Sequence, residues 1–242
     1  MNYAEKLGLR KRIFTNATLL NDIVIKKFRG ISIDNIQISI DGSNSKVHDK
    51  IRGKGTFRQT VTAIKKLKKD YKLTLMTTIQ ENNQDDILNI SRFIKNIGIN
   101  NWCLTVSIPA GRGKKQREIR SEKFLQIMKN FGGCAPAICD STACGVGFGK
   151  IAILANGDIT LCEVMQDLIL GNTSKDDILD IFYNHEQMKK IRNSIVENIE
   201  ECKNCPVKTK CRGGCKASVL YRKGNFFNPD PINCIGHKLR IE

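Results

Sequence analysis

The chain has 242 residues, of which 40% are hydrophobic, and it carries a formal net charge of +16 from 40 Lys and Arg against 24 Asp and Glu. This composition allows a packed core, and no apolar run approaches the roughly 18 residues of a membrane helix. The polar start of the sequence shows no secretory signal. We therefore expect a cytoplasmic protein without a membrane partner, whose ten cysteines are reduced and not paired in disulfides.

The basic excess would suit a nucleic acid or an acidic peptide partner, but its distribution favours solvated helix faces. Lys65 and Lys66 stand beside Ile64 and Leu67 in a pattern typical of a helix with one apolar side. The densest basic stretch, residues 112–120, is expected to be a solvated loop that opens a helix. We expect no nucleic-acid partner.

The first 130 residues alternate strand-like and helical patterns. Ile36, Ile38 and Ile40 alternate with polar residues, which is the period of a strand, whereas the apolar residues of 57–67 recur at helical spacing. We expect strands at 9–15, 36–40, 72–79 and 102–108, and helices at 19–28, 57–67, 85–97 and 122–131. This alternation indicates an α/β fold with a parallel sheet, which carries its chemistry at the carboxyl ends of its strands.

The pattern changes from about residue 134 onward. Asn156 and Gly157 separate two apolar runs and predict a β-hairpin, because both residues tolerate positive φ. A helix is expected over 176–197, followed by a loop-rich segment that its ligands stabilise. We expect two domains, residues 1–132 and 133–242.

Seven of the ten cysteines fall in one pattern, Cys144-x12-Gly157-x4-Cys162, then Cys202-x2-Cys205-x5-Cys211-x3-Cys215, then Cys234. Thiolates at such short spacing can aim several sulfurs at one metal. With Cys134 and Cys139 just upstream, the pattern supplies ligands for two sites, which spacing alone would assign to zinc as readily as to iron-sulfur clusters. Cys144 and Cys162 would meet near the open end of the hairpin. Cys103, inside a predicted strand, is expected to be a small core residue.

The cysteine pattern resembles the SPASM domain, which carries auxiliary clusters in many radical S-adenosylmethionine (SAM) enzymes. The first half is similar to the same enzymes, because Thr15-Asn16-Ala17 resembles their TNG motif. Residues 39–42 (SIDG), followed by His48-Asp49 and Arg52-Gly53, resemble their SxDG…HDxxRG stretch. The resemblance, which extends to peptide-modifying maturases and anaerobic sulfatase-maturating enzymes, implies a partial parallel (β/α) barrel that lacks its first units, followed by a small SPASM domain of a hairpin and loops.

The resemblance also implies the ligands of two auxiliary 4Fe-4S clusters. Cys144, Cys162 and Cys215 would hold the first cluster together with an upstream cysteine, for which Cys139 is expected and Cys134 is the alternative. The second cluster would have four ligands, namely Cys202, Cys205, Cys211 and Cys234.

Three further residues match functional positions of these enzymes. Ser39 matches a residue that hydrogen-bonds the SAM ribose, Arg52 matches one that contacts bound SAM, and Glu163 stands where some relatives carry an acidic residue that takes a substrate proton. Each also has a plain interpretation: Ser39 as a polar residue on the other face of a strand, Arg52 as a surface ion-pair partner, and Glu163 as an exposed carboxylate. His48 would be a helix-entry side chain.

The implied function is the modification of a peptide or protein substrate, in which an electron donor such as ferredoxin or flavodoxin reduces a 4Fe-4S cluster and SAM yields a 5′-deoxyadenosyl radical. The auxiliary clusters would relay an electron or bind substrate. Two alternatives stay open: a relative that modifies haem precursors, and a non-catalytic iron-sulfur binding or electron-transfer module. Nothing in the sequence selects the substrate or the oligomeric state.

One departure from the family is large. The sequence contains no CxxxCxxC motif, which binds the SAM-cleaving cluster in these enzymes, and no GGE segment. We expect a C-terminal portion of such an enzyme, from a truncated or split gene or a misplaced start codon, that does not cleave SAM alone. SAM and a third 4Fe-4S cluster are then expected only in a full-length form.

Overall fold

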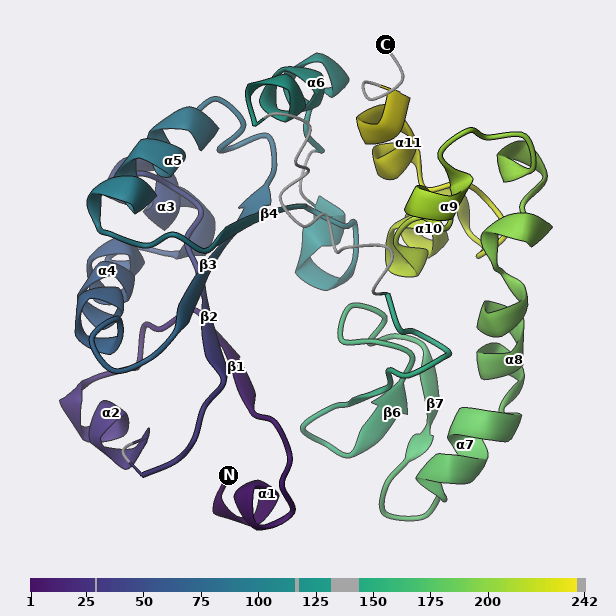
Figure 1. Cartoon of the computed structure of the whole chain (residues 1–242), viewed down its shortest axis with the longest axis horizontal. Helices are drawn as coiled ribbons and strands as arrows, with labels where there is room; N and C mark the ends of the chain where they lie inside the picture. The colour runs from purple at the N-terminus through teal and green to yellow at the C-terminus, as the bar shows by residue number, and fades with distance from the viewer. Residues whose placement is uncertain (29, 116–117, 132–143, 239–242) are drawn as a thin grey trace. The chain divides into compact units, whose positions relative to one another are not determined.

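The computed structural model describes residues 1–28, 30–115, 118–131 and 144–238 (Figure 1). The chain divides into two units, which we call the N-terminal unit (Met1–Val106 with Glu118–Ile127) and the C-terminal unit (Ser107–Arg117 with Met128–Glu242). The expected boundary between Gly132 and Gly133 lies outside the described residues and stays a prediction.

The N-terminal unit is built on a parallel sheet of four strands in the order β1-β2-β3-β4. The strands are β1 (Arg12–Thr15), β2 (Asn35–Ser39), β3 (Leu73–Ile79) and β4 (Trp102–Val106). All four predicted strands are therefore confirmed, although β1 is shorter than the predicted 9–15. Because β1 pairs only with β2 among the described strands, it is an edge of the sheet.

Four predicted helices of the first half are also confirmed, with ends within three residues of the expected ones. They are α2 (Asp22–Phe28), α4 (Thr56–Leu67), α5 (Ile87–Asn96) and α6 (Ser121–Asn130). The sequence did not predict α1 (Asn2–Lys6), α3 (Ser45–Arg52) or the 3-10 helix η1 (Gly111–Lys115). Helix α3 is short and mostly polar, and its start is fixed by the Asn44 side chain, which accepts from the Val47 N–H.

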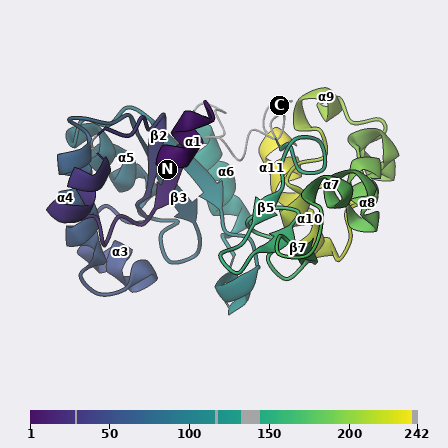
Figure 2. The ribbon, with the colours of Figure 1, turned by 90° about the horizontal axis from the view of Figure 1, so that it is seen from below.

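The two faces of the parallel sheet differ. One face is apolar, with Ile36, Ile38 and Leu75 completely buried, and helices α3, α4 and α5 all lie on one side of the sheet (Figures 1 and 2). The opposite face is half-buried and mostly polar, with the side chains of Gln37, Ser39, Thr74, Met76, Thr78, Cys103 and Thr105. The strand register pairs Ser39 with Met76 and Met76 with Cys103, so these three side chains form one row. Cys103 therefore lies on this polar face, outside the apolar core in which we expected it.

The C-terminal unit contains an antiparallel sheet of three short strands. It contains β5 (Ala152–Ile153), β6 (Asp158–Thr160) and β7 (Ile169–Asn172) in that order. The predicted hairpin is confirmed, because β5 and β6 flank Gly157, whose φ of +87° is a conformation that glycine adopts without strain. Strand β7 was not predicted.

The prediction of a single helix over 176–197 is wrong. The structure has two helices, α7 (Ile178–Asn184) and α8 (Glu186–Asn193), followed by the 3-10 helix η3 (Val196–Asn198). The break lies at His185, whose backbone is extended and whose imidazole Nδ1 accepts from the Gln187 N–H, so that it caps α8. A side chain that caps the following turn replaces the bond that would continue the helix.

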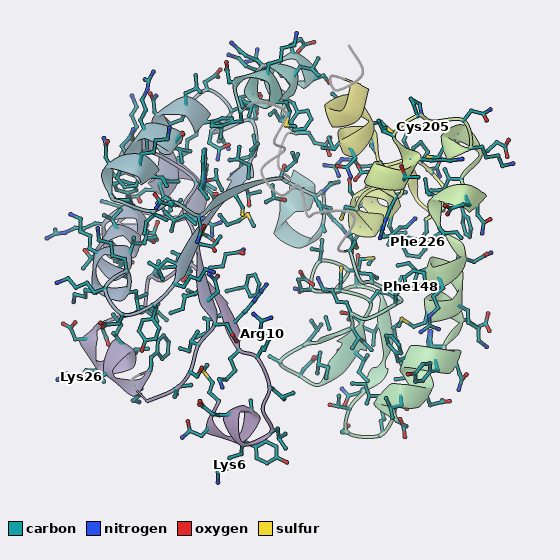
Figure 3. The ribbon with its side chains drawn as sticks, in the orientation of Figure 1. Lys6, Arg10, Lys26, Phe148, Cys205 and Phe226 are labelled. Carbon is teal, nitrogen blue, oxygen red and sulfur yellow. The ribbon has the colours of Figure 1, made fainter. Side chains whose placement is uncertain are left out.

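The rest of the C-terminal unit is more helical than the expected loop-rich segment. It contains η4 (Glu200–Cys202), α9 (Lys208–Cys211), α10 (Lys216–Lys223) and α11 (Pro231–Lys238). Its apolar core includes Ile159, Met165, Met188 and Phe226, which is labelled in Figure 3. Among the described residues of the whole chain, no helix has the length and apolar character to cross a membrane.

Candidate metal centre

The seven described cysteines of the motif are thiols and not disulfides, namely Cys144, Cys162, Cys202, Cys205, Cys211, Cys215 and Cys234. Cys134 and Cys139, the two candidates for the remaining ligand, lie outside the described residues. Within the described ranges, no three Cys, His, Asp or Glu side chains form a group that could hold a metal ion in the structure as it stands.

Three cysteines of the first predicted set share one core. Cys162 follows β6 and is 5% exposed, and Cys144 and Cys215 pack against the same apolar cluster. Burial raises the pKa of the Cys162 thiol, an effect that the backbone N–H groups of Val164 and Met165 partly offset. The structure thus places three cysteines that are far apart in the sequence against one apolar core.

The four cysteines of the second predicted set are electrostatic neighbours. Burial and the negative charges of Cys211, Cys202, Asp230 and Cys205 raise the pKa of Cys234 to about 11. Burial also raises the pKa values of Cys211 and Cys202, with further contributions from other thiolates of the set. Thiolates that repel one another in this way need a cation to hold them together in ionised form.

A cavity of about 490 Å³ is lined by Cys144 of the first set. Gly214 and Lys216 also contribute to its wall, and so does Phe148, which is 63% exposed and is labelled in Figure 3. One water molecule takes up about 30 Å³ in the liquid, so the cavity has room for a group of several atoms. A four-iron cluster takes four cysteine ligands, and Cys144 is the one cysteine among the described residues that line this cavity.

A buried carboxylate links the two sets, and sequence reasoning missed it. Asp230, 2% exposed, accepts the Cys215 N–H through its side chain at 2.9 Å and the Cys234 N–H through its carbonyl oxygen at 2.9 Å. The same side chain accepts from the Ser218 hydroxyl and the Ile232 N–H. The only sequence signal is its place before Pro231, since an acidic residue followed by proline is typical of a helix start.

In the N-terminal unit, Arg52 is committed to an ion pair. Its Nε lies 2.5 Å from the Asp41 carboxylate, whose side chain is 2% exposed and also accepts the Thr78 N–H. Arg52 is therefore an ion-pair partner, in a half-buried position and not on the open surface. Ser39 ends β2 on the polar face of the sheet, beside Met76. The predicted contacts of Ser39 and Arg52 with SAM stay predictions.

The His48 side chain is completely buried under the loop that follows β2. Its Nδ1 accepts the Asp41 N–H at 3.1 Å, and its Nε2 has no hydrogen-bond partner in the described part of the chain. Burial lowers the pKa of His48 from its ordinary value of 6.5, so the ring is neutral at pH 7. Through the hydrogen bond of His48, the HDxxRG-like stretch holds the loop that follows the carboxyl end of β2.

Ala17 occupies the position of the glycine in the TNG motif, which residues 15–17 resemble. Its φ is +60°, a left-handed conformation that strains a residue with a Cβ, and it is 1% exposed. The turn is held by the Thr15 hydroxyl, which accepts the Ala17 N–H, and by the Asn16 carbonyl, which accepts from Thr60.

Glu163, the predicted proton acceptor, is 65% exposed and lies 2.8 Å from the Lys150 ammonium. Burial opposes its ionisation, but the hydrogen bond and charge of Lys150 outweigh this, and the pKa of Glu163 lies below its ordinary value. The carboxylate is therefore ionised at neutral pH and able to accept a proton, although a lowered pKa makes it a weaker base. Its catalytic role stays a prediction.

Comparisons with known proteins agree with this arrangement. Residues 2–94 match the model of the radical SAM superfamily, and residues 144–206 match the SPASM iron-sulfur cluster-binding domain. The chain is 25% identical to the AdoMet-dependent heme synthase of Methanosarcina barkeri over 96% of this chain and 76% of that protein. It is 24% identical to mycofactocin maturase MftC of Mycolicibacterium smegmatis over 96% of this chain and 65% of that protein.

The fold is similar to that of a solved structure, native anSMEcpe with bound AdoMet. The TM-score is 0.74 at 16% identity, over 95% of this chain and 71% of that one. At this identity the likeness concerns the fold, and it agrees with a partial parallel barrel followed by a SPASM domain.

Proposed function

Because residues 2–94 belong to the radical SAM superfamily and residues 144–206 to the SPASM iron-sulfur cluster-binding domains, we propose that this chain is part of an enzyme that modifies a peptide or protein through a SAM-derived radical. The observation that carries the proposal is the order of the two matched segments in one chain. A peptide or protein substrate is favoured by the similarity to a mycofactocin maturase.

Two auxiliary 4Fe-4S clusters are proposed for the C-terminal unit. Cys144, Cys162 and Cys215 would hold one with Cys139 or Cys134, and the second would bind Cys202, Cys205, Cys211 and Cys234. The shared core of the first set and the mutual electrostatic influence of the second support this partition. Bound there, the clusters would supply one-electron transfer.

The polar face of the N-terminal sheet is the proposed place for SAM. Ser39 would donate a hydrogen bond to the ribose, and its neighbours Met76 and Cys103 would border the same space. Arg52 would contact the bound SAM, with its Nε held by the Asp41 carboxylate. Glu163 would accept a substrate proton after losing its contact with Lys150.

Haem-precursor modification is the second candidate. The similarity to an AdoMet-dependent heme synthase over 96% of the chain favours it. A non-catalytic electron-transfer module is the third, favoured by the absence of a CxxxCxxC motif from these 242 residues.

The test is 5′-deoxyadenosine formation, measured by chromatography under anaerobic conditions with dithionite. We expect none from this chain with intact auxiliary clusters, since a SAM-cleaving cluster needs one iron left open by a three-cysteine loop. Activity is expected when a segment that carries CxxxCxxC and two further strand-helix units is joined to it. Turnover by these 242 residues alone would show that Cys134, Cys139 or Cys144 has been misassigned. No turnover after the addition would favour the electron-transfer module.

A further inference from the structure

The residues that directly follow β4 belong to the C-terminal unit. We call Ser107–Lys115 the strap; its inner end is Ser107, and its outer end is the 3-10 helix η1. Within the strap, the Ala110 N–H donates to the Ile108 carbonyl oxygen at 2.7 Å. A Cβ at Gly113 would lie 2.7 Å from that same oxygen, so the close approach requires glycine. The strap is therefore a folded turn with its own internal contacts.

The inner end of the strap is held by Arg222 of α10. The Arg222 guanidinium donates to the Ser107 carbonyl oxygen and to the Ser218 hydroxyl, both at 2.6 Å. Ser218 is 3% exposed and donates in turn to the Asp230 carboxylate at 2.8 Å. Hydrogen bonds from a charged donor are roughly twice as strong as neutral ones. Because Ile108 also packs against the apolar core of the unit, the inner end is firmly fixed.

The outer end of the strap is held by exposed groups. The Lys114 ammonium lies 3.5 Å from the Asp167 carboxylate and 6.0 Å from the centre of the Tyr221 ring, and the Tyr221 hydroxyl donates to the same carboxylate. The side chains of Lys114 and Asp167 are 58% and 54% exposed. Water and salt screen an ion pair at this exposure, so it stabilises little. The neighbouring residues Tyr221 and Arg222 thus hold the two ends of the strap with unequal strength.

We propose that the strap is a hinged segment, in which Arg222 keeps the inner end in place while the outer end opens whenever the contact between Lys114 and Asp167 breaks. Ser107 is bonded to the last residue of β4, and a parallel sheet carries its chemistry at the carboxyl ends of its strands. Segments that open and close at such places control access to a site. In the proposed function, on which this part of the inference rests, the open strap admits the peptide substrate to the residues that follow β4.

The test is amide hydrogen exchange of the whole chain, measured by mass spectrometry at about 0.01 M and about 1 M salt, between which the Debye length falls from about 30 Å to about 3 Å. In the wild type we expect residues 111–115 to exchange about two- to fivefold faster at high salt, as for an exposed ion pair, and residues 107–110 to stay unchanged. Asp167→Asn should exchange fast over 111–115 at both salt concentrations.

The inner end is tested by Arg222→Met, which should speed the exchange of residues 107–110 about tenfold or more, because it leaves the partners of a charged donor unpaired. Arg222→Lys keeps a charged donor and should retain most of the protection. The matched control is Glu186→Gln, which removes an exposed ion pair with Lys189 elsewhere in the same unit and should behave as the wild type at both salt concentrations.

The outcomes separate this inference from the proposed function, because exchange of the strap requires neither a cluster nor SAM. Iron and sulfide uptake by the same samples tests the proposed function. Exchange of residues 111–115 that does not respond to salt in the wild type, or that responds equally in Asp167→Asn, overturns the opening of the outer end. Unchanged exchange of residues 107–110 in Arg222→Met overturns the fixed inner end. If Arg222→Met does not fold, protection of 107–110 in Arg222→Lys supports the inference, and loss of that protection overturns it.

Discussion

The two units differ in what holds them together. The N-terminal unit buries Ile and Leu side chains between a parallel sheet and its helices, and its fold follows from apolar periodicity. The C-terminal unit has an apolar core too, but it also buries thiols, the Asp230 carboxylate and the Lys216 ammonium. Buried polar groups of this kind stabilise a fold only when their partners are in place. From this comparison we expect the first unit to depend on packing and the second to depend also on the clusters proposed for it.

The largest effect that would sharpen this comparison is the loss of one cluster. Cys211→Ala should remove about four of the eight irons that two four-iron clusters contain, and Cys162→Ala should remove the other four. Both changes should speed amide hydrogen exchange in the C-terminal unit and leave the strands of the N-terminal unit protected, because metal ligation is coupled to folding. Iron analysis and exchange measured by mass spectrometry check this.

The matched control for the cysteine variants is Cys103→Ala. Cys103 lies in β4 of the N-terminal unit and belongs to neither set, so the variant should keep its full iron content. Loss of both clusters from Cys211→Ala alone would refute the partition into two sites.

A mutation that disturbs packing in the N-terminal unit should lower the stability of that unit and leave the iron content unchanged. Leu75 is completely buried in β3, and Leu75→Ala should lower the free energy of unfolding of this unit by about 2–5 kcal/mol. Leu19→Ala, at a side chain that is 82% exposed, should change it by less than about 0.5 kcal/mol. Chemical denaturation followed by exchange measures both, and iron content should stay at the wild-type level in each.

The same contrast explains how far the sequence could be read. Alternating isoleucines such as Ile36 and Ile38 directly indicate the buried face of a strand. For this reason the predicted strands and long helices of the first half are confirmed. Helix α3 was missed because it is polar, and the break at His185 because a capping imidazole leaves no periodic signal. Lys216 and Asp230 were missed because a lysine and an aspartate in a cysteine-rich segment look like surface residues until their burial is known.

Acidification should weaken the N-terminal unit through His48. Its folded-state pKa is lowered by burial, so the unfolded chain binds a proton first as the pH falls below 6.5. Stability is then lost towards acid, by at most about 1.4 kcal/mol per pH unit for this group. Denaturation at pH 7 and pH 5 checks this against His48→Gln, which should show a smaller loss. An equal loss in the variant would assign the pH dependence to other groups.

The smallest expected effect is a gain in the stability of the N-terminal unit. Ala17→Gly should relieve the left-handed strain at φ +60° and stabilise the N-terminal unit by up to about 1 kcal/mol. The added freedom of glycine in the unfolded chain limits the gain. Ala152→Gly in β5 is the control, since a strand residue without positive φ should only lose stability. A fall in the melting temperature of Ala17→Gly would contradict the strain.

The central claim is that the C-terminal unit binds two iron-sulfur clusters, and metal and acid-labile sulfide analysis of the anaerobically produced chain tests it most directly. The account predicts about eight irons and eight sulfides per chain, in two four-iron clusters. Stoichiometric zinc without sulfide would contradict it and would turn both cysteine sets into structural zinc sites.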